Sequence, residues 1–185
     1  MRATGLVRRI DNLGRVVIPK ELRKALRIRV GDPVDIFTNR EGNIMLKKYS
    51  PIRELRDFAN NYCKSLEQTI GNIILICDRD NIISVSGVPE KIFINKKVSA
   101  DLDKVMEAQK TLAFGEGLES IITLCADSED ECKYSAQIVS PISAGGNIIG
   151  TVIIASKERG KNFSNIELKL AETAATYLGN QVECY

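Results

Sequence analysis

The sequence predicts an α+β protein with two modules, a small β-rich N-terminal module and a larger α/β sandwich around an antiparallel sheet. Charge is divided between them: residues 1–50 hold 12 Lys+Arg against 5 Asp+Glu, a net charge of +7, and residues 51–185 hold 14 against 19, a net charge of −5. The strand and helix signals also follow a different order in each part, and Ser50-Pro51 marks a helix start at the boundary. A basic head joined to an acidic body is typical of a polyanion-binding module attached to a second domain.

The N-terminal module is expected to run strand, strand, helix, strand, strand. Strands are expected over residues 4–10, 15–18, 34–38 and 43–48, and a helix is expected to open at Pro19 and cover residues 20–26. Turn-forming sequences at residues 11–14 and 39–42 join the strands in pairs. So short a module buries too little apolar surface to fold alone, so we expect an intertwined dimer with strands interleaved between subunits.

A helix is expected over residues 51–70, between the two modules, because apolar residues recur there at helical spacing. Since no flexible linker is present, this helix could transmit a change in the second module to the first. We therefore expect domains over residues 1–50 and 71–185 with the helix between them.

The second module alternates strand and helix signals. Strands are expected over residues 72–78, 82–87, 119–125, 133–142 and 147–156. Ser99 is expected to cap a helix whose apolar face carries Leu102, Val105, Met106 and Leu112. The pattern indicates an α/β sandwich around an antiparallel sheet of five or six strands.

A final helix is expected after Ser164-Asn165-Ile166-Glu167, a sequence typical of a capping box. Its buried face is expected to consist of Ile166, Leu170, Ala174, either Tyr177 or Leu178, and Val182.

The composition argues against an enzyme or a metalloprotein. The chain has no histidine, which removes the commonest general base and the commonest transition-metal ligand. Its five cysteines are scattered without C-x-x-C spacing, and Cys77 and Cys125 lie in apolar strands, so we expect reduced core thiols. We expect no catalytic residue, no metal site and no cofactor.

The apolar runs are too short to cross a membrane, and the N-terminus is unlike a signal peptide. The expected location is therefore the cytoplasm.

Basic residues gather on the expected helix at residues 20–26 and at the strand ends before it. Lys20, Arg23, Lys24 and Arg27 follow helical spacing, and Glu21 is the only acid among them. The pairs 20/24 and 23/27 repel by up to about 1 kcal/mol in all when no polyanion is bound. Arg8, Arg9 and Arg15 extend the same positive region. A nucleic-acid contact is favoured over an ordinary solvated face, because such faces normally mix charges of both signs.

Double-stranded DNA is favoured over RNA or single strands as the ligand. No aromatic residue precedes Phe37, so the stacking that holds unpaired bases is not indicated. A protein that holds a duplex mainly with Lys and Arg is positioned on phosphates and loses affinity steeply as salt rises.

The stretch ATGLVRRIDNLGRVVIPKELRKALRIRVGDPVDIFTNREGNIMLKKYSP, with GRVVIPKE as Gly14 to Glu21, resembles the AbrB-like swapped-hairpin DNA-binding domain. The segments SPIRELRDFA and LICDRDNIISVSG extend the resemblance to the stage V sporulation protein T family of spore-forming bacteria. The family's DNA-contacting positions match Arg8, Arg9, Arg15, Arg23 and Lys24. Lys24 stands where an arginine is often found, which retains the charge but loses bidentate contacts.

This resemblance implies a sporulation regulator that activates and represses genes, acts at the nucleoid of the forespore and assembles as a dimer or tetramer. It also implies a GAF-like second domain, which could bind a small effector of unknown identity or join dimers into tetramers. The sequence offers no diagnostic pocket: Gly115-Glu116-Gly117 is typical of a loop turn, and a hairpin turn accounts for Asp78, Arg79 and Asp80.

An antitoxin is the alternative, because swapped-hairpin domains also occur in toxin-neutralising proteins. Antitoxins usually carry a disordered tail that wraps the toxin, whereas residues 72–185 have the periodicity of folded strands and helices. The expectation is therefore a DNA-binding regulator.

Overall fold

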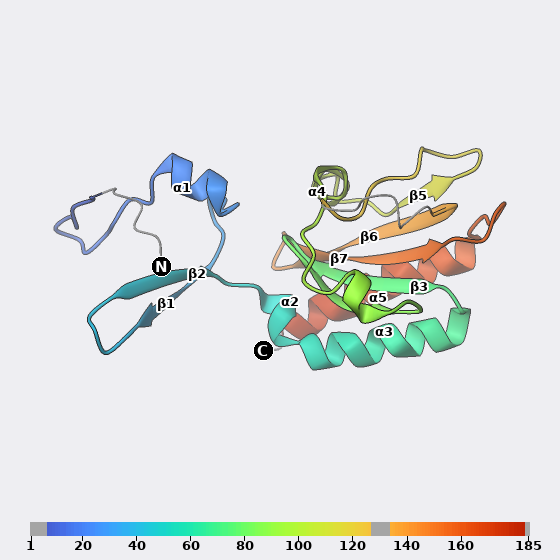
Figure 1. Ribbon diagram of the computed structural model, residues 1–185, viewed down its shortest axis with the longest axis horizontal. Coiled ribbons are helices and arrows are strands. Elements are labelled where there is room, and N and C mark those ends of the chain that lie inside the picture. The colour runs from blue at the N-terminus through green and yellow to red at the C-terminus, as the bar shows by residue number, and fades with distance from the viewer. Residues whose placement is uncertain (1–6, 127–133, 184–185) are drawn as a thin grey trace. The chain divides into compact units, whose positions relative to one another are not determined.

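A computed structural model describes residues 7–126 and 134–183 and divides the chain into two compact units, Met1–Tyr49 (unit 1) and Ser50–Tyr185 (unit 2) (Figure 1). The joint between the units falls at the peptide bond that links Tyr49 to Ser50.

Unit 1 contains one short helix and one hairpin. These are α1 (Lys20–Ala25), β1 (Val34–Thr38) and β2 (Ile44–Lys48), with β1 and β2 antiparallel and in register from Val34↔Lys48 to Thr38↔Ile44. Asn39 closes the hairpin turn, because its side-chain oxygen accepts hydrogen bonds from the amides of Glu41 and Asn43.

The strand pair expected over residues 4–10 and 15–18 is not formed by the residues that the structure describes, and residues 4–6 lie outside them. Residues 7–10 and 15–18 join no ladder in the described part of the chain, although the turn between them forms, with Gly14 at a φ of 74°. A strand requires a hydrogen-bonding edge, and the edges expected for these segments are those of a second subunit.

The described part of unit 1, residues 7–49, has no apolar interior. No large hydrophobic side chain between residues 7 and 49 is buried, and Val30 is 91% exposed. Apolar side chains that would fill a core instead face outward, including Val7, Ile10, Val17, Ile36 and Ile44.

Unit 2 is built on a five-stranded antiparallel sheet of order β4-β3-β7-β6-β5. Its strands are β3 (Ile73–Asp78), β4 (Ile82–Ser86), β5 (Leu112–Gly115), β6 (Ala136–Ala144) and β7 (Asn147–Ser156). Its helices are α2 (Pro51–Glu54), α3 (Arg56–Ile70), the 3-10 turn η1 (Glu90–Ile92), α4 (Ala100–Glu107) and α5 (Asn165–Glu183).

Both faces of the sheet are covered, so every residue of β3 is buried (Figure 1). On one face, Ala59 and Cys63 of α3 and Leu178 of α5 pack with Ile74 and Ile76. On the other face, α4 and its flanking loops form a second core, whose members include Leu75, Cys77, Phe93, Leu102 and Met106. The expected α/β sandwich is confirmed.

The fifth strand is β5, and residues 119–125 do not form the expected strand. Gln109, two residues after the end of α4, has a left-handed conformation. Leu112, which was expected to lie on the apolar face of this helix, begins β5 instead. Residues 119–125 are held by the buried Gln137, whose amide donates to the Ile122 carbonyl and accepts from the Ile122 amide, both at 3.0 Å. The Gly115 amide donates to the Glu119 carbonyl and the Ser99 amide donates to the Leu124 carbonyl, so these residues are held by separate contacts instead of a strand ladder.

The expected helix over residues 51–70 is two helices, broken at Leu55 (φ −87°, ψ 23°). Both belong to unit 2.

The cap predictions are confirmed at both later helices. Ser99 Oγ accepts from the Leu102 amide, and Glu167 accepts from the Ser164 amide, as in a capping box. The predicted buried face of α5 was wrong at Ile166, which is 71% exposed. Of the two alternatives Tyr177 and Leu178, Leu178 is the buried one.

Candidate nucleic-acid interface

The turn at residues 11–15 is organised by the Asp11 carboxylate. One oxygen accepts the amides of Leu13 at 3.0 Å and Arg15 at 2.8 Å, and the other accepts Arg15 Nε at 2.9 Å. Hydrogen bonds from the backbone and side chain of Arg15 and from the Leu13 amide lower the pKa of Asp11 below its ordinary value. Arg15 is therefore fixed at the turn while its side chain stays 71% exposed.

Arg8 and Arg9 precede this turn and are both exposed. In α1, Lys20 and Lys24 are exposed and Arg23 is half-buried, and the Arg23 Nε is covered and has no hydrogen-bond partner among the described residues. The helix presents these cations with Glu21 as its only acidic residue.

Arg27 lies beyond the end of α1, so the expected helical stripe ends at Lys24. Its φ of 51° is left-handed, the Arg27 amide donates to the Lys24 carbonyl, and the Ile28 amide donates to the Arg23 carbonyl. This is a Schellman motif with an arginine where glycine is usual.

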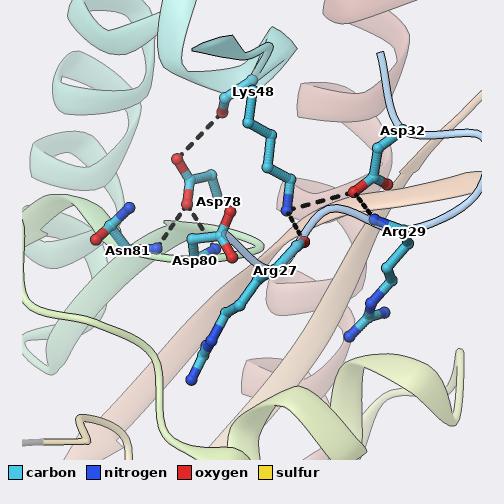
Figure 2. Close-up of polar contacts among 8 residues, drawn as sticks. Arg27, Arg29, Asp32, Lys48, Asp78, Asp80 and Asn81 are labelled. Carbon is cyan, nitrogen blue, oxygen red and sulfur yellow. Dashed lines mark hydrogen bonds and ion pairs between the residues drawn. The ribbon is translucent and has the colours of Figure 1, made fainter. Parts of the chain in front are cut away.

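Two residues that the sequence did not single out hold this helix end. Lys48 Nζ donates to the Arg27 carbonyl at 3.0 Å and lies 3.5 Å from an Asp32 carboxylate oxygen, which accepts the Arg29 amide at 2.9 Å (Figure 2). Twenty-one positions separate Lys48 from Arg27. No local sequence pattern signals such a contact.

In unit 2, the buried Asp78 carboxylate ties the β3–β4 turn to the start of the unit. One oxygen accepts the amides of Asp80 at 2.8 Å and Asn81 at 2.6 Å (Figure 2), and the other accepts Ser50 Oγ at 3.1 Å and pairs with Arg53 at 2.9 Å. The carboxylate is thus engaged in structural contacts, as the hairpin-turn interpretation predicts.

A surface groove of about 380 Å³ lies between α3 and α5 of unit 2. Its aromatic wall consists of Phe58, Tyr62 and Tyr177, with the Tyr177 ring centre 5.6 Å from each of the other two. An open aromatic groove of this kind suits a protein contact.

The cysteines in the described chain belong to the cores of unit 2. Cys63, Cys77 and Cys125 are buried and unbridged, and burial raises the pKa of Cys63 to about 12. Thiols of this kind react slowly, as expected of core residues. Cys132 and Cys184 lie outside the described residues.

Residues 7–126 and 134–183 contain no cluster of three side chains suited to hold a metal ion, and none of their helices is long and apolar enough to span a membrane.

Comparison with known proteins finds a family model that matches each part of the chain. Residues 54–183 match the family model described as "Stage V sporulation protein T C-terminal, transcription factor", and residues 7–54 match "Antidote-toxin recognition MazE, bacterial antitoxin". The chain is 47% identical to stage V sporulation protein T of Bacillus subtilis (strain 168), over 99% of both chains. It is 53% identical to the transition state regulatory protein AbrB of the same organism, over 28% of this chain and 52% of AbrB.

Unit 2 also resembles solved GAF domains. A GAF domain/HD domain protein from Geobacter sulfurreducens superposes with a TM-score of 0.56 at 14% identity, over 72% of this chain and 97% of that one. At this identity the likeness shows the fold alone.

Proposed function

The chain belongs to the stage V sporulation protein T family, and from that membership we propose that it is a transcriptional regulator of sporulation genes that binds double-stranded DNA through unit 1. The proposed regulator activates some genes and represses others, in the cytoplasm at the nucleoid of the developing forespore. Its proposed DNA-binding residues are Arg8, Arg9, Arg15, Lys20, Arg23, Lys24 and Arg27.

The observation that carries this proposal is the geometry of the basic residues in unit 1. Arg15 is exposed at a turn fixed by Asp11, and α1 presents Lys20, Arg23 and Lys24 with one acid among them. A surface of this composition attracts a polyanion and positions it through phosphate contacts.

Unit 1 is proposed to function as a dimer with interleaved strands. Its apolar side chains face outward in the single chain, and residues 7–10 and 15–18 leave their strand pairing unmade. A second subunit would bury those side chains and complete the ladders, which supports a swapped hairpin.

The test is a titration of the full chain with a short duplex at several salt concentrations. We expect Arg15→Ala and Arg23→Ala to weaken binding and to reduce the salt slope by about one unit for each lost phosphate contact. Arg40→Ala is the matched control, because Arg40 is exposed in unit 1 but lies in the β1–β2 turn. Arg15→Ala is the cleaner variant, since Arg23 is half-buried. Equal binding by all four proteins would contradict the proposal.

Unit 2 is proposed to hold two such dimers together as a tetramer, through the groove between α3 and α5. Tyr177 is 42% exposed there and packs against Phe58 and Tyr62, so a second copy could bury the same aromatic wall. Sensing of a small effector by the GAF-like fold is the second proposed role.

The tetramer is tested by light scattering of Tyr177→Arg. Because a charge buried at a subunit interface is costly, we expect this variant to sediment and scatter as a dimer. Thr173→Arg, at another exposed residue that lines the groove, should weaken the tetramer in the same way. Lys104→Ala is the control, because Lys104 is exposed on α4, which covers the opposite face of the sheet. An intact tetramer in Tyr177→Arg would exclude this surface.

The antitoxin alternative is not favoured. Unit 2 has two apolar cores around a five-stranded sheet, which is unlike the disordered tail by which such proteins wrap a toxin.

A further inference from the structure

A largely buried ion pair lies where α1 ends (Figure 2). Lys48, the last residue of β2, has a side chain only 19% exposed, and the side chain of Asp32 is 11% exposed. Lys48 Nζ donates to the Arg27 carbonyl, and Asp32 accepts the Arg29 amide. The pair therefore connects the hairpin of unit 1 to the segment that leaves α1.

Helix α1 has few stabilising features of its own. It is six residues long, it buries none of them, and Pro19 at its N-cap supplies no side-chain hydrogen bond. Helices this short are unstable in isolation, so the contacts at their ends decide how they lie. At its C-terminal end, Arg27 must also hold a left-handed conformation that is unfavourable for any residue with a side chain.

We infer that Lys48 and Asp32 are positioning residues for DNA binding: they clamp the C-terminal end of α1 and so set the direction in which Lys20, Arg23 and Lys24 meet the duplex. The inference rests on the proposed function of unit 1. The Lys48 ammonium suits a helix C-terminus, where carbonyl groups carry partial negative charge. Lys48 therefore acts on the protein and not on a phosphate, although it contributes to the net charge of unit 1.

The sign of the effect of Asp32→Asn separates the clamp from simple electrostatics. The substitution raises the net charge by one, so long-range attraction alone would tighten DNA binding. If the ion pair positions α1, the same substitution should weaken DNA binding, because the ion pair is lost. We expect the full-length variant to bind a short duplex about five- to tenfold more weakly, the effect of one hydrogen bond of typical net strength. The salt slope should stay unchanged, since no phosphate contact is removed.

Lys48→Met has a matched control in Lys47→Met, which removes the same charge from the neighbouring, exposed position. We expect Lys48→Met to weaken DNA binding as Asp32→Asn does, and Lys47→Met to change it less than twofold. The double variant Asp32→Asn/Lys48→Met should bind no more weakly than either single variant, because the two residues act as one unit. Lys48→Arg retains the cation and should bind nearly as the native chain does.

Two readouts separate positioning from unfolding. Titration at high protein concentration gives the active fraction, which should equal that of the native chain. Hydrogen exchange at Ile28, whose amide closes the helix end, should accelerate in Lys48→Met and not in Lys47→Met. If Asp32→Asn or Lys48→Met has a smaller active fraction than the native chain, the test rests on Lys48→Arg instead. Loss of DNA affinity in Lys48→Arg would then overturn the inference.

Tighter or unchanged binding by Asp32→Asn, or a Lys47→Met effect equal to that of Lys48→Met, would also overturn the inference. Either result leaves the proposed function standing if Arg15→Ala still weakens binding. Failure of the native chain to bind any duplex would instead remove the proposed function.

Discussion

At the scale of single residues, Asp11 shows how an acid can serve a basic surface. Its carboxylate accepts three hydrogen bonds from Leu13 and Arg15 and closes the turn on which Arg15 stands. The side chain is exposed, so its value lies in local geometry and not in the stability of a core. An acid next to an arginine that is proposed to contact DNA is useful when it fixes where the arginine lies.

Acid should open this turn. The folded-state pKa of Asp11 is lowered, so the carboxylate supports the turn above its ordinary pKa of 3.8 and the support is lost as the pH falls through the lowered value. We expect the Arg15 amide resonance to titrate with a midpoint below 3.8 in NMR spectra recorded over that range. Asp11→Asn should abolish the titration, and a midpoint at or above 3.8 would refute the assignment.

At the scale of elements, α5 lies against β6 without a side chain between them at one point. A Cβ atom added to Gly179 would stand 2.1 Å from the Ser143 carbonyl oxygen, which is far inside contact distance. Glycine in a helix normally costs about 1 kcal/mol relative to alanine, so this glycine is retained for the close approach and not for the helix.

Gly179→Ala should therefore destabilise unit 2 although it raises helix propensity. We expect a loss of about 1 to 3 kcal/mol in the free energy of unfolding, the usual range for overpacking. Asn180→Ala, next to it on the exposed side of α5, should be neutral or slightly stabilising. Thermal and denaturant unfolding of both variants measures the difference, and equal melting temperatures would show that α5 shifts freely.

The sequence allowed prediction of what local patterns determine and not what distant residues determine. The hairpin at residues 34–48, both helix caps and the basic residues of α1 follow from turn chemistry, capping and spacing. Residues 119–125 have strand composition, yet distant residues hold them outside a ladder, with Ile122 bonded to the amide of Gln137 and Leu124 bonded to the backbone of Ser99. Lys48 and Asp32 were missed at the candidate site for the same reason, because only the fold brings them to the end of α1.

At the scale of the whole molecule, the two units meet at a joint without a linker. The helix expected to connect them belongs to unit 2, where Ala59, Cys63 and Leu66 of α3 are buried against the sheet. The covalent connection between the units is therefore the Tyr49–Ser50 joint, and Asp78 holds the residues that follow this joint, Ser50 and Arg53.

The same two-glycine insertion at two places tests this division. Inserted between Tyr49 and Ser50, it should leave the melting temperature of unit 2 and the affinity for a short duplex nearly unchanged. Inserted after Asn60, it should rotate the rest of α3 by about 200° and turn Cys63 and Leu66 away from the core, which lowers the melting temperature strongly. Calorimetry and duplex titration measure both effects, and the reverse order of stabilities would place α3 outside unit 2.

The outward-facing apolar residues of unit 1 have a consequence for the lifetime of the protein. A newly made chain that has not met a second copy displays Val7, Val17 and Val30 to proteases and chaperones, which act on exposed apolar segments. Turnover would then be fastest for unassembled chains, so that the amount of regulator in the cell is limited by its own assembly.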